Sequence, residues 1–280
     1  MAYSAEISRT HPSCFLFLID QSGSMSDVFS KTNTSKSAAV ADAINRMLQQ
    51  LVIKCAKSEG VRDYYHVGVI GYGNGGAKPA FLGAIAGQNL VPISLIAKTP
   101  ARVEQRTKKV SDGAGGLIET TVKFPIWFDA VNEGGTPMKE AFTTANDIIR
   151  NWLGQHPDCF PPVVMNFTDG ESTDGDPLDE MRNLTSKASS DGNVILFNVH
   201  ASVRSSNIIS FCGAETTLPD QYAELLFNGA SILPDFMKKV AKEEYQYSLP
   251  GDAKAFVLNG DIEMIVTAIE IGTRPANLLR

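Results

Sequence analysis

The sequence predicts a doubly wound α/β fold, in which helices flank both faces of a mostly parallel sheet. Its apolar runs are short and continuous, without the alternation of polar and apolar residues that a half-exposed strand shows. Segments with helical periodicity separate these runs. The chain has 280 residues, of which 43% are hydrophobic and 20% charged, so it is long enough to bury the core of such a domain.

Four apolar runs are expected to form buried strands. They are rich in β-branched residues and phenylalanine, and two of them end in an aspartate. Continuous apolar runs suit strands that are covered on both faces, as in a parallel sheet between helices. The four runs are residues 13–20, 66–72, 162–169 and 193–199.

Helices are expected between and after these strands. The longest, residues 36–59, carries apolar side chains at three- and four-residue steps, with Ser35 suited as its N-cap and Gly60 as its stop. Pro137 stands at a first-turn position of the second helix, where proline is favoured. The other expected helices are residues 137–153, 178–190 and 231–244, followed by an apolar helix near 260–269.

The region between Gly73 and Thr121 interrupts this alternation of predicted strands and helices. It contains glycines, isolated prolines and a basic run from Arg102 to Lys109, and it holds too little apolar sequence for a core of its own. Residues 120–130 then have an extended pattern. We therefore predict one domain over residues 1–280, with an edge hairpin insertion at about 74–121 and a C-terminal helical extension at about 245–280.

Composition narrows the range of functions. The net charge of −6 is not the basic footprint expected of a protein that binds nucleic acid or an anionic membrane. No stretch has the length of a signal-peptide core or of a membrane span, which predicts a cytoplasmic protein. The four cysteines form no Cys-x-x-Cys pair, so a zinc ribbon is not expected and the thiols should be reduced.

Oxygen ligands gather in three predicted loops. Asp20, Ser22 and Ser24 follow the first strand, and alternate residues of an extended segment point the same way. Thr136 stands just before a helix, and Asp169 ends a later strand. Because ligands of open parallel sheets bind beyond the carboxyl ends of the strands, these loops are predicted to meet there.

These side chains suit a hard divalent cation. Hydroxyls and carboxylates are ligands of Mg²⁺, Mn²⁺ or Ca²⁺ and not of copper or zinc. Mg²⁺ takes six oxygens, so three hydroxyls and two acids leave at least one position for an external ligand. We predict bound Mg²⁺, with Mn²⁺ or Ca²⁺ as alternatives, and expect it to serve function because a chain of this length folds without a metal.

The three segments resemble the metal-ion-dependent adhesion site of von Willebrand factor A (vWA) domains: Asp-x-Ser-x-Ser, Gly-Gly-Thr-Pro and Thr-Asp-Gly, in that order. The resemblance implies a Rossmann-like fold in which Ser22, Ser24 and Thr136 bind the cation directly. Asp20 and Asp169 would lie nearby, one or both acting through water. The family also implies that an Asp or Glu carboxylate of a partner protein occupies the remaining position, and that the module is not an enzyme.

The resemblance covers residues 13 to about 244. Two departures are a long stretch over residues 26–35 and the insertion near 74–121. The single-domain form is similar to bacterial cytoplasmic vWA proteins, including those linked to tellurite resistance and to stress or phage response. That similarity implies an adaptor in an intracellular complex, and it leaves the partner and the oligomeric state open.

Other interpretations of the site remain open at this point. One is a metal-dependent phosphoester hydrolase, although no general base accompanies the acids. Another is a scaffold whose metal only stiffens the loops. Taken singly, Ser22 and Ser24 are typical turn residues, and Thr136 is a typical helix cap.

Three further patterns have plainer explanations. The Gly-x-Gly-x-x-Gly of residues 71–76 is not followed by the helix that a dinucleotide site requires, and is predicted to be a turn. The acid-rich residues 169–176 lack the closing glutamate of an EF-hand loop. His200 ends a predicted strand and is expected to be a structural residue.

Overall fold

The computed structural model describes residues 3–28, 33–111, 116–201, 208–260 and 262–272. At its centre is a sheet in the order β13-β14-β12-β9-β1-β4-β5, with β6 also beside β4. Neighbouring strands from β14 to β4 are parallel, and antiparallel strands lie only at the two edges. The parallel strands are β1 (Ser13–Asp20), β4 (Tyr65–Gly73), β9 (Val163–Thr168), β12 (Ile195–His200) and β14 (Phe256–Leu258); the antiparallel ones are β5 (Gly76–Pro79), β6 (Val91–Pro92) and β13 (Ile209–Ser210).

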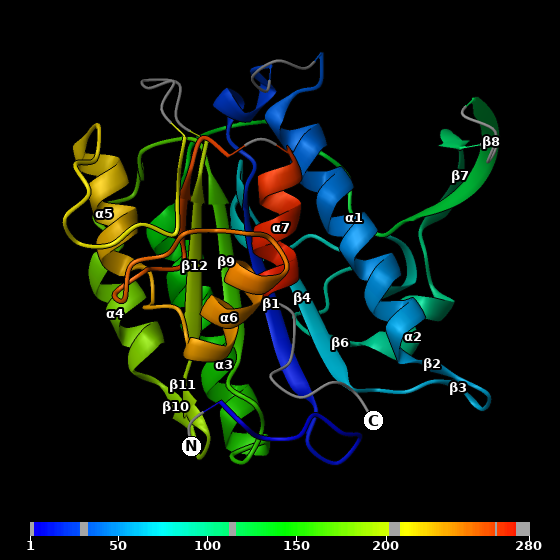
Figure 1. Cartoon of the computed structure of the whole chain (residues 1–280), viewed down its shortest axis with the longest axis horizontal. Helices are drawn as coiled ribbons and strands as arrows, with labels where there is room; N and C mark the ends of the chain where they lie inside the picture. Colours follow the sequence, from blue (N-terminus) through cyan, green and yellow to red (C-terminus); the bar gives the residue numbers. More distant parts are fainter. Residues whose placement is uncertain (1–2, 29–32, 112–115, 202–207, 261, 273–280) are drawn as a thin grey trace.

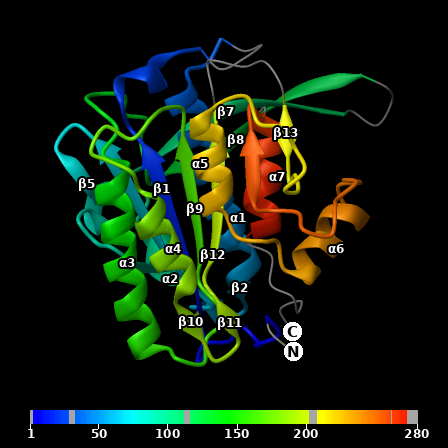
Figure 2. The same ribbon diagram turned by 90° about the vertical axis from the view of Figure 1, so that its left-hand side faces the viewer.

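Helices cover both faces of this sheet, so the predicted mixed α/β architecture with a largely parallel sheet is confirmed (Figures 1 and 2). One face carries α1 (Lys36–Cys55), α6 (Asp235–Glu243) and α7 (Ile262–Gly272). The other carries α3 (Met138–Gln155), α4 (Leu178–Ser186) and α5 (Gln221–Gly229). Of the helices in the described ranges, none is both long enough and apolar enough to cross a membrane.

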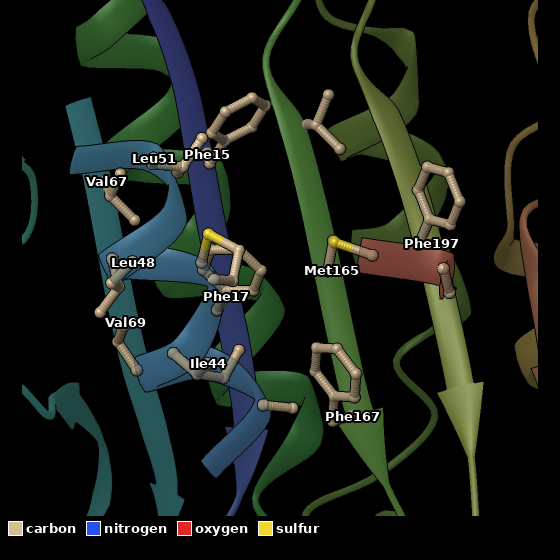
Figure 3. Close-up of a cluster of buried hydrophobic side chains, with 14 of the residues drawn as sticks. Phe15, Phe17, Ile44, Leu48, Leu51, Val67, Val69, Met165, Phe167 and Phe197 are labelled. Atoms are coloured by element: carbon tan, nitrogen blue, oxygen red, sulfur yellow. The ribbon is translucent and has the colours of Figure 1, made fainter. Parts of the chain in front are cut away.

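The core forms two layers because the side chains of each strand alternate between the two faces. In β1, Phe15 and Phe17 pack toward α1, whereas Leu16 and Leu18 pack toward α3. Figure 3 shows the first layer, in which Phe17 lies near Leu48 of α1. Such two-sided burial explains why the strands are continuous apolar runs.

The boundaries of several helices differ from the sequence prediction for local reasons. Helix α1 begins at Lys36 with Ser35 as its cap, as predicted, but it ends at Cys55 because the chain turns back through β2 (Ala56–Lys57) and β3 (Gly60–Val61). Helix α6 begins only after Pro234, and proline is poorly tolerated within a helix. Helix α4 stops at Ser186, before the short pair β10 (Ala188–Ser189) and β11 (Gly192–Asn193).

The region of the predicted insertion contains β5, β6 and the short elements η2 (Gly83–Ile85) and α2 (Ile93–Lys98). It continues into β7 (Arg102–Ser111) and β8 (Leu117–Ile126), which pair only with each other and project from the α1 side of the domain (Figure 1). Arg102 pairs with Asp129 at 2.7 Å, and the guanidinium of Arg106 lies 3.7 Å from the ring centre of Phe124. The arginines of the predicted basic run are therefore engaged within the protein.

Candidate metal site

The candidate site lies where two central strands end. β1 pairs with β4 on one side and with β9 on the other, so the order of strands reverses at the boundary between β1 and β9. Asp20 is the last residue of β1, and Asp169 directly follows β9. Open α/β sheets bind their ligands at such a reversal, beyond the carboxyl ends of the strands.

Asp20 is fully buried and its carboxylate organises the first loop. One oxygen accepts a hydrogen bond from the backbone N–H of Ser22 at 2.8 Å, and the other accepts from the Thr168 hydroxyl at 2.7 Å. Burial raises the pKa of Asp20 to about 6, although these hydrogen bonds oppose the shift and the charge of Asp169 adds to it. Because the pKa is raised, ionisation of Asp20 lowers the stability of the fold, beginning near its ordinary pKa of 3.8 and in full above about pH 6.

The two serine hydroxyls point toward each other, and that of Ser24 also contacts Asp169. Ser22 Oγ lies 3.1 Å from Ser24 Oγ, and Ser24 Oγ donates to Asp169 Oδ1 at 2.7 Å. The Ser26 hydroxyl, by contrast, donates to a backbone group of its own loop, the Gly23 carbonyl. Ser24 is therefore more than a turn residue, because its hydroxyl contacts a side chain from a loop far away in sequence, and the Ser22 hydroxyl lies next to it.

Thr136 reaches the same place from the loop before α3. Its backbone N–H donates to Thr173 Oγ1, and its carbonyl accepts from the N–H of Thr173, both at 2.9 Å. A Cβ placed on Gly170 would lie 3.8 Å from Thr136 Oγ1 and 3.9 Å from Ser24 Oγ. The two hydroxyls thus border one small space, which any side chain at position 170 would enter.

Thr136 is not needed as the cap of α3. The carboxylate of Asp174 accepts hydrogen bonds from the backbone N–H groups of Lys139 and Glu140, at 3.0 and 2.8 Å. That side chain satisfies the first turn of the helix from another loop. The hydroxyl of Thr136 is therefore available to a ligand.

Backbone hydrogen bonds join the loops of Ser22 and Thr136 to each other and to the turn after β4. The N–H of Gly23 donates to the Gly134 carbonyl at 3.1 Å, and that of Asn74 donates to the Glu133 carbonyl at 2.8 Å. Gly134 has a φ of +85°, and a Cβ there would lie 2.8 Å from the Asn74 backbone. At Gly73 a Cβ would lie 2.8 Å from the Gln21 carbonyl oxygen. These glycines permit a close approach that no larger residue allows.

The glycine-rich residues 71–76 end β4 and begin β5, and Asn74 and Gly75 form the turn between Gly73 and Gly76. The expectation of a turn is confirmed. What the sequence did not predict is that this turn contacts the loops of the candidate site. The only signal in the sequence is the cluster of glycines, which indicates close backbone approach without naming the neighbour.

Lys36 is the residue at the site that sequence analysis missed. It is the first residue of α1, and its side chain is only 6% exposed. Its ammonium nitrogen lies 2.7 Å from Asp169 Oδ2 and 3.6 Å from the more exposed Asp27. A lysine at the positive end of a helix is unfavourable unless an acid pairs with it, and that mismatch was the available signal.

The remaining acids near the site have structural roles. Asp174 caps α3, and Asp176 accepts from the backbone N–H of Leu178 at 2.9 Å. In the described part of the chain, no cluster of three or more His, Cys, Asp or Glu side chains is arranged to hold a metal. A second, EF-hand-like site in residues 169–176 is therefore not formed by such a cluster, and the predicted site depends on its hydroxyls.

His200 ends β12 and is buried, with 3% of its surface exposed. Its pKa is lowered by burial, so the neutral ring is favoured. Nδ1 has no hydrogen-bond partner among the described residues. These properties agree with the expected structural role better than with that of an exposed general base.

The oxygen atoms brought together here fit a hard divalent cation. Two neighbouring corners of an Mg²⁺ octahedron with bonds near 2.1 Å are about 3 Å apart. The hydroxyls of Ser22 and Ser24 have that separation, at 3.1 Å. Asp169 contacts Ser24 from the end of β9, and the Thr136 hydroxyl borders the space beside Gly170 that Ser24 also borders. Asp20 accepts a hydrogen bond from the backbone of the serine loop.

A groove adjoins the site on the α5 side. Its volume is about 370 Å³, and it begins at Gly170, next to Asp169. Met138, Leu225 and Leu226 supply apolar lining, and Glu171 lies along it. The candidate site thus opens beside a groove of mixed polar and apolar lining.

The chain matches no protein-family model and no curated protein. It is similar to solved structures of pilus proteins. The pilus adhesin SpaC from Lactobacillus rhamnosus GG aligns with a TM-score of 0.49 at 12% identity, over 99% of this chain and 31% of SpaC. The pilus adhesin RrgA from Streptococcus pneumoniae gives 0.32 at 14% identity, over 62% and 22%.

A third similar structure is the vWF domain of the type V pili tip protein Mfa5 from Porphyromonas gingivalis. It aligns with a TM-score of 0.31 at 14% identity, over 58% of this chain and 39% of that one. The chain therefore spans well under half of the length of these structures. At such identities and TM-scores, the likenesses carry no argument about function.

Proposed function

We propose that this protein is a metal-dependent interaction module of the vWA type, which captures an acidic side chain of a partner protein. The observation that carries the proposal is the convergence of Ser22, Ser24, Thr136 and Asp169 from three loops at the carboxyl end of the sheet. The bound ion would be Mg²⁺, with Mn²⁺ or Ca²⁺ as alternatives.

Each residue has a separate part in the proposal. The hydroxyls of Ser22, Ser24 and Thr136 would bind the cation, and they leave it electron-poor because they carry no negative charge. Asp169 would orient the Ser24 hydroxyl through their hydrogen bond, and Asp20 would fix the serine loop through the Ser22 N–H. Bound there, the cation supplies an electrophilic position for an external carboxylate.

The surroundings support a protein partner. The groove that begins at Gly170 can receive neighbouring side chains of the segment that brings the carboxylate. Leu225 adds apolar lining beside the polar side chains of Glu171 and Ser172, so a partner segment can make contacts here beyond its carboxylate. We propose an adaptor role in a cytoplasmic complex, similar to that of the tellurite-linked vWA proteins. Cell fractionation, with an antibody to detect this chain in each fraction, tests that location.

The capture of a carboxylate is tested with peptides selected by display against the protein in Mg²⁺ buffer. We expect the selected peptides to share an Asp or Glu, and to lose at least about tenfold in affinity when it becomes Asn or Gln. EDTA should abolish binding. Peptides that bind equally well in EDTA would contradict the proposal, and a metal that changes only stability would indicate a scaffold. Metal-dependent turnover of a generic phosphoester would instead support a hydrolase.

A further inference from the structure

Lys36 places a positive charge inside a site that is built for a cation. Its ammonium lies 2.7 Å from Asp169 Oδ2, and the pair is almost completely shielded from water. The other oxygen of Asp169 accepts from Ser24, at 2.7 Å. Asp169 therefore links the lysine to the hydroxyls that would bind the metal.

The fold alone does not account for a lysine at this position. The N-terminus of α1 already carries partial positive charge, so a cation in its first turn is unfavourable. A buried ion pair also gains little over apolar residues of similar volume. The buried Asp169 is the main partner that stabilises the lysine, with the more exposed Asp27 at 3.6 Å, so the lysine's presence is tied to the site and not to the helix.

The formal charges of the site show what Lys36 changes. Among the buried groups, Asp20 and Asp169 contribute −2 and Lys36 contributes +1, whereas the charge of Asp27, 3.6 Å from the ammonium, is screened because its side chain is 55% exposed. The buried groups therefore carry −1 without metal and +1 with a divalent cation. An incoming carboxylate would return it to zero. Without Lys36 the corresponding values are −2, zero and −1, so the metal would bind readily but the partner's acid would meet excess negative charge.

We propose that Lys36 is a built-in counter-cation that weakens binding of the metal alone and favours joint binding of the metal and an acidic partner. The inference rests on the proposed function, and it adds a regulation of that site. While no divalent cation is bound, Lys36 holds the Asp169 carboxylate in the position that metal binding requires. When a divalent cation is bound, the lysine's charge makes a carboxylate ligand necessary to balance the site.

Calorimetric titration with Mg²⁺ alone tests whether Lys36 weakens binding of the metal. It compares wild type, Lys36→Met and the control Lys54→Met. Lys54 is an exposed residue at the far end of the same helix, so the control removes the same charge without touching the site. We expect Lys36→Met to bind Mg²⁺ at least about tenfold more tightly than wild type, because an unscreened positive charge is lost near the ion. Lys54→Met should match wild type.

Thermal unfolding in EDTA is the second readout. Lys36→Met leaves Asp169 buried without its cation, so we expect a midpoint at least about 5 °C lower, and Mg²⁺ should restore it. If this variant is too unstable to titrate, Lys36→Gln removes the charge while retaining a hydrogen-bond donor to Asp169. Addition of glutamate should tighten Mg²⁺ binding more in wild type than in either variant.

The outcomes separate the two proposals. Tighter Mg²⁺ binding by Lys36→Met, even where wild type binds too weakly to measure, supports the role of Lys36. Equal affinity in wild type and Lys36→Met overturns it and leaves the metal-dependent module intact. Absence of Mg²⁺ and Mn²⁺ binding in every variant overturns both.

Discussion

Substitution of Asp169 by alanine should destabilise the metal-free protein by about 3–5 kcal/mol. The carboxylate is inaccessible to solvent, and its removal leaves the ammonium of Lys36 buried. Asp27 remains at 3.6 Å, but its exposed side chain compensates only weakly. Urea unfolding of wild type and Asp169→Ala in EDTA measures the difference.

The matched control is Asp174→Ala, five residues further along the same loop. Asp174 is exposed and caps α3 through two backbone N–H groups, so its loss should reduce stability by about 1 kcal/mol. The double variant Lys36→Met/Asp169→Ala should recover much of the stability lost in Asp169→Ala. If Asp169→Ala lowers the free energy of unfolding no more than Asp174→Ala does, that result would contradict the buried ion pair.

Substitution of Gly134 by alanine should destabilise the protein by about 2 kcal/mol or more and weaken Mg²⁺ binding. The φ of +85° disfavours any residue with a side chain, and the new Cβ would meet the Asn74 backbone at 2.8 Å. The Gly134 carbonyl also accepts from Gly23 N–H, so a displaced backbone would move the serine loop. Urea unfolding and Mg²⁺ titration measure the two effects.

Gly154→Ala provides the comparison. Gly154 lies in α3, and a Cβ there would meet no atom within 4 Å. Alanine is the better helix former, so this variant should gain up to about 1 kcal/mol and bind Mg²⁺ as wild type does. A Gly134→Ala variant that unfolds and binds like Gly154→Ala would show that the loops do not depend on this close approach.

The layered fold was predictable because strands that are buried on both faces are continuous apolar runs in the sequence. β1 was predicted at its observed bounds, since every residue from Ser13 to Asp20 is buried. Short elements were harder to predict. Helix α2 and the edge strands β6 and β13 have too few residues to establish a period, and the pairing of the strands depends on distant segments.

The candidate site was predictable as far as its oxygens follow strand ends. Asp20 and Asp169 lie on neighbouring parallel strands, so their meeting follows from topology. The contact of Lys36 with Asp169 spans 133 positions in sequence and depends on the orientation of one side chain, which no local pattern encodes. The bonds from Gly23 to Gly134 and from Asn74 to Glu133 join backbone groups, and these carry no residue-specific signal.

The most direct test of the account is calorimetric titration of metal-free protein with Mg²⁺, comparing wild type, Thr136→Val and Thr143→Val. Valine keeps the shape of threonine and removes only the hydroxyl. Thr143 is an exposed residue of α3 whose hydroxyl bonds to the helix backbone, so it serves as the control. Glutamate is included in a parallel titration, so that the external carboxylate is available.

We predict one Mg²⁺ per chain for wild type and for Thr143→Val, at least in the presence of glutamate. Thr136→Val should bind at least about tenfold more weakly, because one of the three hydroxyl ligands is missing. Equal binding by Thr136→Val and wild type, or no binding of Mg²⁺ or Mn²⁺ by wild type with glutamate present, would contradict a metal site formed by these three loops.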